Sequence, residues 1–166
     1  MKRITALLYH DFTALDALGP LEVLGRLPGY EIRYASLFGG PVSNEKGLVV
    51  MTEALPSPGP GDILLIPGGM GSRQLALQDD FLAALRKAAL ASTVVMTVCT
   101  GSALAAAAGL LDGLHATGNK RAFDWTMSMG KKVLWQRERA LSLAESMEYG
   151  WNERPEGGWC FKRQGK

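Results

Sequence analysis

Residues 94–109, VVMTVCTGSALAAAAG, decide the fold of this chain. An apolar, β-branched run of strand length ends at Cys99, and a helix-forming stretch of small residues follows without a linker. A buried strand that leads straight into a helix is typical of a parallel sheet covered by helices on both faces. Cys99 is therefore expected at the carboxyl edge of such a sheet, where ligands bind in open α/β folds.

The chain on either side continues this alternation of short apolar runs and helical periods, with no internal repeat. The pattern predicts strands at residues 4–9, 31–38, 63–67 and 93–99, short strands or a hairpin within 42–50, and helices at 13–27, 79–91 and 100–109. The first helix should be kinked or restarted at Pro20. The stretch PSPGPGD at 56–62 must be a loop. We therefore predict one α/β domain over residues 1–130.

Length and composition limit the classes of protein that this chain can belong to. The 166 residues are 47% hydrophobic and 20% charged, with a formal net charge of +2. Such a chain can bury one core, which excludes disorder as its dominant state. The basic side chains form no long run, so no nucleic-acid partner is expected. Without a secretory signal or about 18 consecutive apolar residues, we expect a cytoplasmic protein with no membrane partner and with free thiols at Cys99 and Cys160.

Residues 131–166 differ in kind from the rest of the chain. Residues 130–166 hold 8 basic and 5 acidic groups, net +3, whereas residues 1–129 hold 10 basic and 11 acidic groups, net −1. A helix is possible at 137–147, but the residues after it have no period and include Trp151 and Trp159. We expect a divergent C-terminal segment that is partly helical or poorly ordered.

The position of Cys99 before a helix suggests that it is a nucleophile. The first amides of that helix and its positive dipole end would favour thiolate over thiol. Gly101 would let a substrate approach the backbone. The alternative interpretation is that Cys99 is a small, buried hydrophobic residue that ends a strand.

Two further positions fall at the same predicted edge of the sheet. Gly68 and Gly69 follow the 63–67 strand, so their N–H groups could form an oxyanion cradle, or the pair could be only a tight turn. Asp16 lies at the start of the first helix. Beside a thiolate the pKa of its carboxyl would rise, which would let it act as acid or base. Equally, Thr13 and Asp16 could form a capping box with no chemical role.

Other kinds of site have little support in the sequence. His10 and His115 are the only histidines, and both are expected at the periphery. The sequence contains no metal-ligand spacing and no phosphate-binding glycine motif. Neither a metal nor an organic cofactor is therefore expected, and the expected partner of the site is a small-molecule substrate.

Three segments resemble the ThiJ/PfpI family of the class I glutamine-amidotransferase-like superfamily. They are FTALDALGPLEVL at 12–24, DILLIPGGMG at 62–71 and VVMTVCTGSALAAAAGLLDG at 94–113. The first and third are most similar to the isonitrile hydratase subgroup. The resemblance implies a flavodoxin-like three-layer αβα sandwich with a mostly parallel sheet, a cysteine on a strained nucleophile elbow, and a homodimer.

The resemblance also implies roles for single residues. Cys99 would be the nucleophile, Asp16 its acid/base partner and Thr100 an assisting hydroxyl or amide. The backbone around the substrate or its oxyanion would be supplied by Gly68, Gly69 and Gly101. The implied reaction is attack of the Cys99 thiolate on an isonitrile, followed by hydrolysis of the thioimidate to an N-substituted formamide.

The chain departs from the family pattern in two places. Asn119 stands where many relatives carry a histidine, so a Cys-His dyad is not expected, which favours a hydratase over a peptidase. Residues 138–166 contain nothing like the strand, turn and long helix of relatives, and truncation, a reading-frame change and divergence are all open. Two alternatives to an enzyme are a ligand-sensing domain, as in AraC-type regulators, and a redox sensor whose Cys99 is oxidised.

Overall fold

The structure is a computed structural model that describes residues 1–137 and 161–162. Several predictions made from the sequence fall outside these residues. They are the predicted helix at 137–147, of which only residue 137 is described, the tail that carries Trp151 and Trp159, and the thiol of Cys160.

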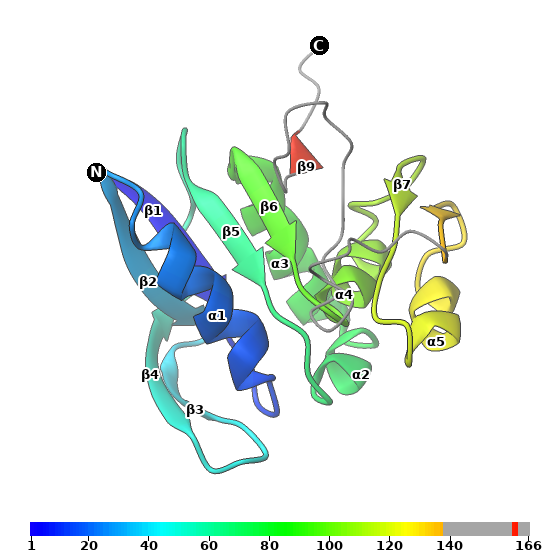
Figure 1. Ribbon diagram of the computed structural model, residues 1–166, viewed down its shortest axis with the longest axis horizontal. Helices are drawn as coiled ribbons and strands as arrows, with labels where there is room; N and C mark the ends of the chain where they lie inside the picture. Colours follow the sequence, from blue (N-terminus) through cyan, green and yellow to red (C-terminus); the bar gives the residue numbers. More distant parts are fainter. Residues whose placement is uncertain (138–160, 163–166) are drawn as a thin grey trace.

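A seven-stranded sheet forms the centre of the described fold (Figure 1). Its strands are β1 (Lys2–Leu7), β2 (Tyr30–Ser36), β3 (Gly40–Ser43), β4 (Val49–Ala54), β5 (Ile63–Ile66), β6 (Val94–Thr97) and β9 (Phe161–Lys162). The spatial order is β3-β4-β2-β1-β5-β6-β9. The strands from β4 to β6 in this order are parallel, whereas β3 pairs antiparallel with β4, and β9 with β6. The predicted mostly parallel sheet is confirmed.

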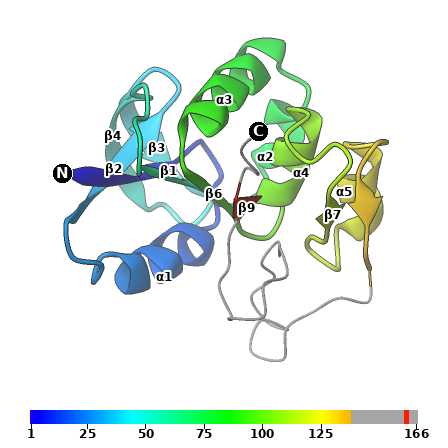
Figure 2. The ribbon, with the colours of Figure 1, turned by 90° about the horizontal axis from the view of Figure 1, so that it is seen from above.

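Helices cover both faces of this sheet (Figure 2). On one face lies α1 (Ala14–Leu24), and on the other lie α3 (Asp79–Ala91) and α4 (Gly101–Ala107). The short α2 (Ser72–Leu75) follows β5. Beyond α4 come α5 (Phe123–Ser128) and a small parallel sheet of β7 (His115–Ala116) and β8 (Leu134–Trp135). The described chain is thus a flavodoxin-like three-layer α/β fold, as the sequence predicted.

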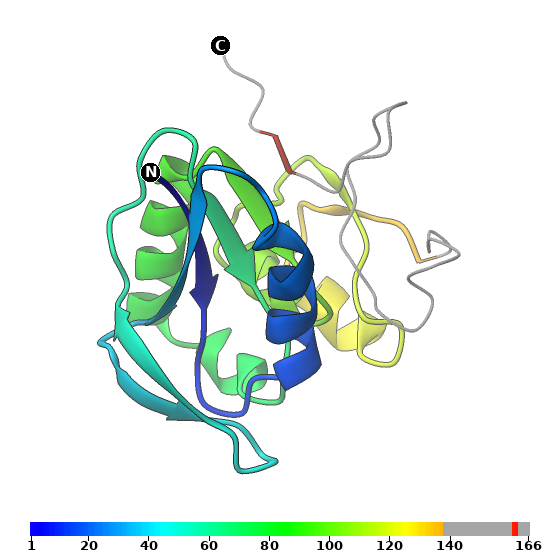
Figure 3. The same cartoon turned by 60° about the vertical axis from the view of Figure 1, so that its left-hand side comes forward.

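The centre of the sheet carries continuous buried runs because helices cover both of its faces. All four residues of β5, ILLI, are buried, and so are the last four residues of β1. The β3–β4 hairpin extends from the body of the sheet (Figure 3) and alternates instead, with Val42 and Thr52 buried and Val49 and Met51 exposed. Continuous apolar runs therefore mark the covered strands, and alternation marks the uncovered ones.

The helices predicted around the sheet are confirmed, with two adjustments. α1 runs as one helix through Pro20, so it is not restarted at the proline. α4 is shorter than the predicted 100–109 helix, and Gly109 after it has a φ of +69°, a conformation that favours glycine and ends helices. Among the described residues, no helix combines the length and apolar character that a membrane-spanning segment needs.

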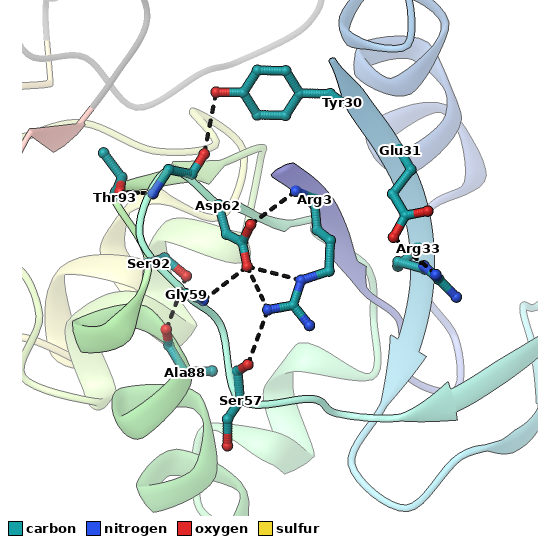
Figure 4. A network of polar contacts seen from close by, with 11 residues as sticks. Arg3, Tyr30, Glu31, Arg33, Ser57, Gly59, Asp62, Ala88, Ser92 and Thr93 are labelled. Atoms are coloured by element: carbon teal, nitrogen blue, oxygen red, sulfur yellow. Dashed lines mark hydrogen bonds and ion pairs between the residues drawn. The ribbon is translucent and has the colours of Figure 1, made fainter. Parts of the chain in front are cut away.

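An ion pair joins the loop at 56–62 to the start of β1 (Figure 4). The buried carboxylate of Asp62 accepts hydrogen bonds from Arg3 Nε at 2.9 Å, from Arg3 Nη2 at 2.6 Å, and from the N–H groups of Arg3 and Gly59, both at 2.8 Å. Arg3 also donates to Ser57 O at 3.1 Å. Burial raises the pKa of Asp62, but the hydrogen bonds from Gly59 and Arg3, with the guanidinium charge, outweigh it and lower the pKa.

We expect Asp62→Ala to lower the free energy of unfolding at neutral pH by about 2–4 kcal/mol, because it leaves the half-buried Arg3 guanidinium without its carboxylate. A lowered pKa stabilises the fold above the unfolded value of about 4, and this contribution is lost as the pH falls through the folded pKa. Urea unfolding at about pH 7 and about pH 3 should therefore show a smaller acid loss in Asp62→Ala than in wild type.

Asp112→Ala is the matched control for this substitution, since it removes an exposed aspartate from the loop after α4. It should unfold like the wild-type protein at both pH values. Equal urea midpoints for Asp62→Ala and wild type at neutral pH would contradict the role given to Asp62.

Candidate active site

Cys99 lies in a sharp turn between β6 and α4. Its φ is +55°, a left-handed conformation that costs a non-glycine residue roughly 1–2 kcal/mol. At Gly101, where α4 begins, an added Cβ would collide with the carbonyl oxygen of Ile66 and approach that of Pro67. A strained strand-to-helix turn of this kind is typical of a nucleophile elbow. Gly101 serves the close packing of this turn, and its contact with a substrate stays a prediction.

Asp16 reaches the same turn from the first turn of α1. It is buried, and its carboxyl lies close enough to the Cys99 thiol for its charge to raise the pKa of that thiol. Gly68 lies between them, because an added Cβ would stand 2.7 Å from Cys99 Cβ and 2.8 Å from Asp16 Oδ2. A side chain at residue 68 would therefore push the two groups apart. The capping-box interpretation is wrong, since the Thr13 side chain makes no capping hydrogen bond to α1.

Thr100 joins the turn after β6 to the turn after β5. Its hydroxyl accepts a hydrogen bond from Gly69 N–H at 3.0 Å and lies 3.0 Å from the hydroxyl of the fully buried Ser72. The Ser72 hydroxyl donates to Gly69 O at 2.6 Å, and Gly101 N–H donates to Val98 O at 2.8 Å. In this structure the amide of Gly69 joins the two turns, and the amide of Gly101 closes the turn after β6. Their roles toward a substrate oxyanion stay predictions.

Two more side chains at this edge were not among the predicted site residues. Asn119, in the loop between β7 and α5, donates from Nδ2 to Cys99 Sγ at 2.9 Å. Tyr9, just beyond β1, is buried and donates its hydroxyl to Pro67 O at 2.7 Å. Burial raises the pKa of Tyr9 well above its usual range, and the charges of Asp16 and Cys99 raise it further. Tyr9 is therefore a neutral donor at neutral pH.

The surroundings of Cys99 favour the thiol. Burial and the negative charge of Asp16 raise the pKa of Cys99 to about 11, against the hydrogen bonds from Thr100 N–H and Asn119, which lower it. At pH 7 such a pKa leaves only about 0.01% of the sulfur as thiolate. The expectation of a thiolate favoured by the helix is therefore wrong, because burial and Asp16 outweigh the amide donors. The role of Cys99 as a nucleophile stays a prediction; its attack would require a base, and the neighbouring carboxyl is that of Asp16.

The histidines make contacts of other kinds. His10 Nδ1 accepts a hydrogen bond from Ser43 N–H at 3.3 Å, and the exposed His115 contacts the side chain of Gln136. Within residues 1–137 and 161–162, no group of three or more His, Cys, Asp or Glu side chains could hold a metal ion.

Comparison with known proteins places this chain in a family. The model of the DJ-1/PfpI family matches residues 2–140. The chain belongs to the DJ-1/PfpI family. It is 32% identical over 129 residues to an isonitrile hydratase of Pseudomonas putida, a match that covers 77% of this chain and 57% of that protein. The chain thus spans little more than half the length of this relative.

Solved structures of DJ-1/PfpI proteins have the same fold. A ThiJ/PfpI family protein from Pseudomonas syringae matches with a TM-score of 0.70 and 29% identity, over 78% of this chain and 55% of that one. An AraC family transcriptional regulator from Pseudomonas putida matches with a TM-score of 0.63 and 18% identity, over 82% and 76% of the two chains. At that identity the regulator shares the fold alone. The resemblance to ThiJ/PfpI proteins that the three sequence segments indicated is confirmed.

Replacing Asp16 with asparagine should lower the pKa of Cys99, because it removes the negative charge that holds the proton on sulfur and keeps the side-chain size. Alkylation of Cys99 by iodoacetamide, measured on the Cys99 peptide by mass spectrometry, should have its midpoint at about pH 11 in the wild-type protein. In Asp16→Asn the midpoint should fall by about one pH unit or more.

The same peptide alkylated in urea-unfolded protein supplies the reference, with a midpoint of about 8.5. A folded wild-type midpoint at this reference value, or an unchanged midpoint in Asp16→Asn, would show that Asp16 does not control the Cys99 proton.

Proposed function

We propose that this chain hydrates a small isonitrile to an N-substituted formamide, with Cys99 as nucleophile and Asp16 as acid and base. The observation that carries this proposal is the contact between the Asp16 carboxyl and the Cys99 thiol in a strained strand-to-helix turn. The relative at 32% identity is named isonitrile hydratase, which supports this class of substrate. Because the chain spans 57% of that relative, the activity is a proposal for this chain.

The first step forms a bond between Cys99 Sγ and the terminal carbon of the isonitrile. The thiol proton passes to the Asp16 carboxylate as sulfur attacks, and Asp16 then delivers this proton to the same carbon. The product is a thioimidate, in which sulfur is bonded to the carbon of a CH=N–R group. This order suits a thiol with a pKa of about 11, since no thiolate has to accumulate at neutral pH.

The second step adds water to the thioimidate carbon. Asp16, again a carboxylate, takes a proton from the water and gives it to the nitrogen, which leaves a tetrahedral carbon that carries OH, NHR and the Cys99 sulfur. Collapse of this intermediate breaks the carbon–sulfur bond, and the hydroxyl proton returns to sulfur. The sum is R–NC plus water giving R–NH–CHO, with Cys99 and Asp16 restored.

The alternatives to an enzyme differ in their support. A redox sensor needs a cysteine of low pKa, whereas the pKa of Cys99 is raised to about 11. A ligand-sensing domain stays a prediction, since the AraC family regulator shares the fold alone.

The expected homodimer also stays a prediction.

Incubation of the protein with a simple alkyl isonitrile should produce the formamide, measured by mass spectrometry, because Cys99 and Asp16 supply the nucleophile and the proton transfers. Cys99→Ala should give only the rate of the buffer. Asp16→Asn should lose about 100-fold or more in kcat, since both proton transfers pass through its carboxyl.

Cys160→Ala is the matched control, because it removes the other thiol of the chain and should keep the wild-type rate. Equal formamide production by wild type and Cys99→Ala would overturn the hydratase proposal. An isonitrile-dependent rise in Tm without turnover would support ligand sensing instead.

A further inference from the structure

We infer that Asn119 is a catalytic hydrogen-bond donor, whose side-chain amide holds the Cys99 sulfur while the thiol proton is on Asp16. The effect on turnover rests on the proposed function, but the effect on the sulfur does not. The inference begins with the 2.9 Å hydrogen bond from Asn119 Nδ2 to Cys99 Sγ.

The orientation of the Asn119 amide is fixed by its other end. Asn119 Oδ1 accepts a hydrogen bond from Ala122 N–H at 2.9 Å, at the start of α5. If the amide were turned around, its NH₂ group would face this backbone N–H, and two donors would oppose each other. The contact with Ala122 therefore directs the NH₂ group of Asn119 at the Cys99 sulfur.

The segment that carries Asn119 is packed closely against α4 and α5. At Gly118, an added Cβ would lie 2.6 Å from Ser102 Oγ and 3.0 Å from Thr126 Cγ2, and Thr126 is fully buried. Phe123, also buried, packs edge-to-face against Trp135 with ring centroids 6.0 Å apart. These contacts position Asn119 before any substrate binds, as electrostatic stabilisation of a developing charge requires.

Asn119 and Asp16 act on the sulfur in opposite directions. The Asp16 carboxylate, from α1, disfavours the thiolate, and the neutral amide of Asn119 favours it. Tyr9, next to β1, stays protonated because burial raises its pKa. Asparagine does not titrate, so Asn119 offers its donor at every pH and cannot accept the thiol proton, which leaves that role to Asp16.

Two substitutions separate a donor from a purely structural residue. Asn119→Asp keeps the size and the acceptor for Ala122 N–H but places a carboxylate oxygen against sulfur. Asn119→Ala removes both contacts. As a donor, Asn119 predicts that Cys99 alkylation at a fixed, mildly alkaline pH falls about 10-fold in Asn119→Ala and about 100-fold in Asn119→Asp. A structural role predicts the reverse order, because only the alanine variant loses the contact with α5.

The Tm of each variant reports on folding separately, and Asn119→Asp should melt closer to wild type than Asn119→Ala. Alkylation of Asn119→Asp at the wild-type rate, or faster than Asn119→Ala, would overturn the inference. If alkylation falls as expected but wild type makes no formamide, the role of Asn119 at sulfur stands and the hydratase proposal fails. If wild type hydrates isonitriles and both variants keep the wild-type alkylation rate and kcat, the hydratase proposal stands and the role of Asn119 is rejected.

Discussion

One buried contact, between the Asp16 carboxyl and the Cys99 thiol, sets the requirements that the rest of the site meets. β1, β5 and β6 are parallel neighbours, so the segments after them meet at one edge and bring Asp16, Gly68 and Cys99 together. Residue 68 must lack a side chain for the contact to form. The left-handed turn at Cys99 persists because the close packing of α4 against the end of β5 fixes it.

The same contact decides which chemistry the cysteine can perform. Burial and a neighbouring carboxylate keep Cys99 protonated, so the proposed reaction begins with a proton transfer and not with a standing thiolate. Asp62, at the opposite edge of the sheet, shows the contrasting case. Four hydrogen bonds from Arg3 and Gly59 lower the pKa of its carboxyl and fix it as a structural ion pair. The two buried carboxyls therefore differ in their partners: Asp62 is paired with a cation, and Asp16 lies beside the thiol through which the proposed reaction runs.

The sequence predicted the fold well because parallel strands covered on both faces are rich in apolar residues, and ILLI and the run VVM show this without any structure. It also predicted that Asp16, Gly68 and Cys99 share an edge, since strand ends in a parallel sheet do. The direction of the Cys99 pKa was predicted wrongly, because it depends on burial and on the distance to Asp16, which is 83 positions away in the chain. Ser72 and Tyr9 were missed as contacts for a related reason, since each reaches the edge through tertiary packing and no local pattern marks it. Asn119 was noted only because it stands where many relatives carry a histidine, and its contact with the Cys99 sulfur was not predicted.

The state of the Cys99 proton is the point on which the whole account depends, and infrared spectroscopy of the S–H stretch observes it directly. In a Cys160→Ala background at neutral pH, the folded protein should show one S–H band, which Cys99→Ala removes. That band should disappear only as the pH approaches about 11. A folded protein with no S–H band from Cys99 at neutral pH would mean a standing thiolate, and would contradict the account of a thiol that passes its proton to Asp16.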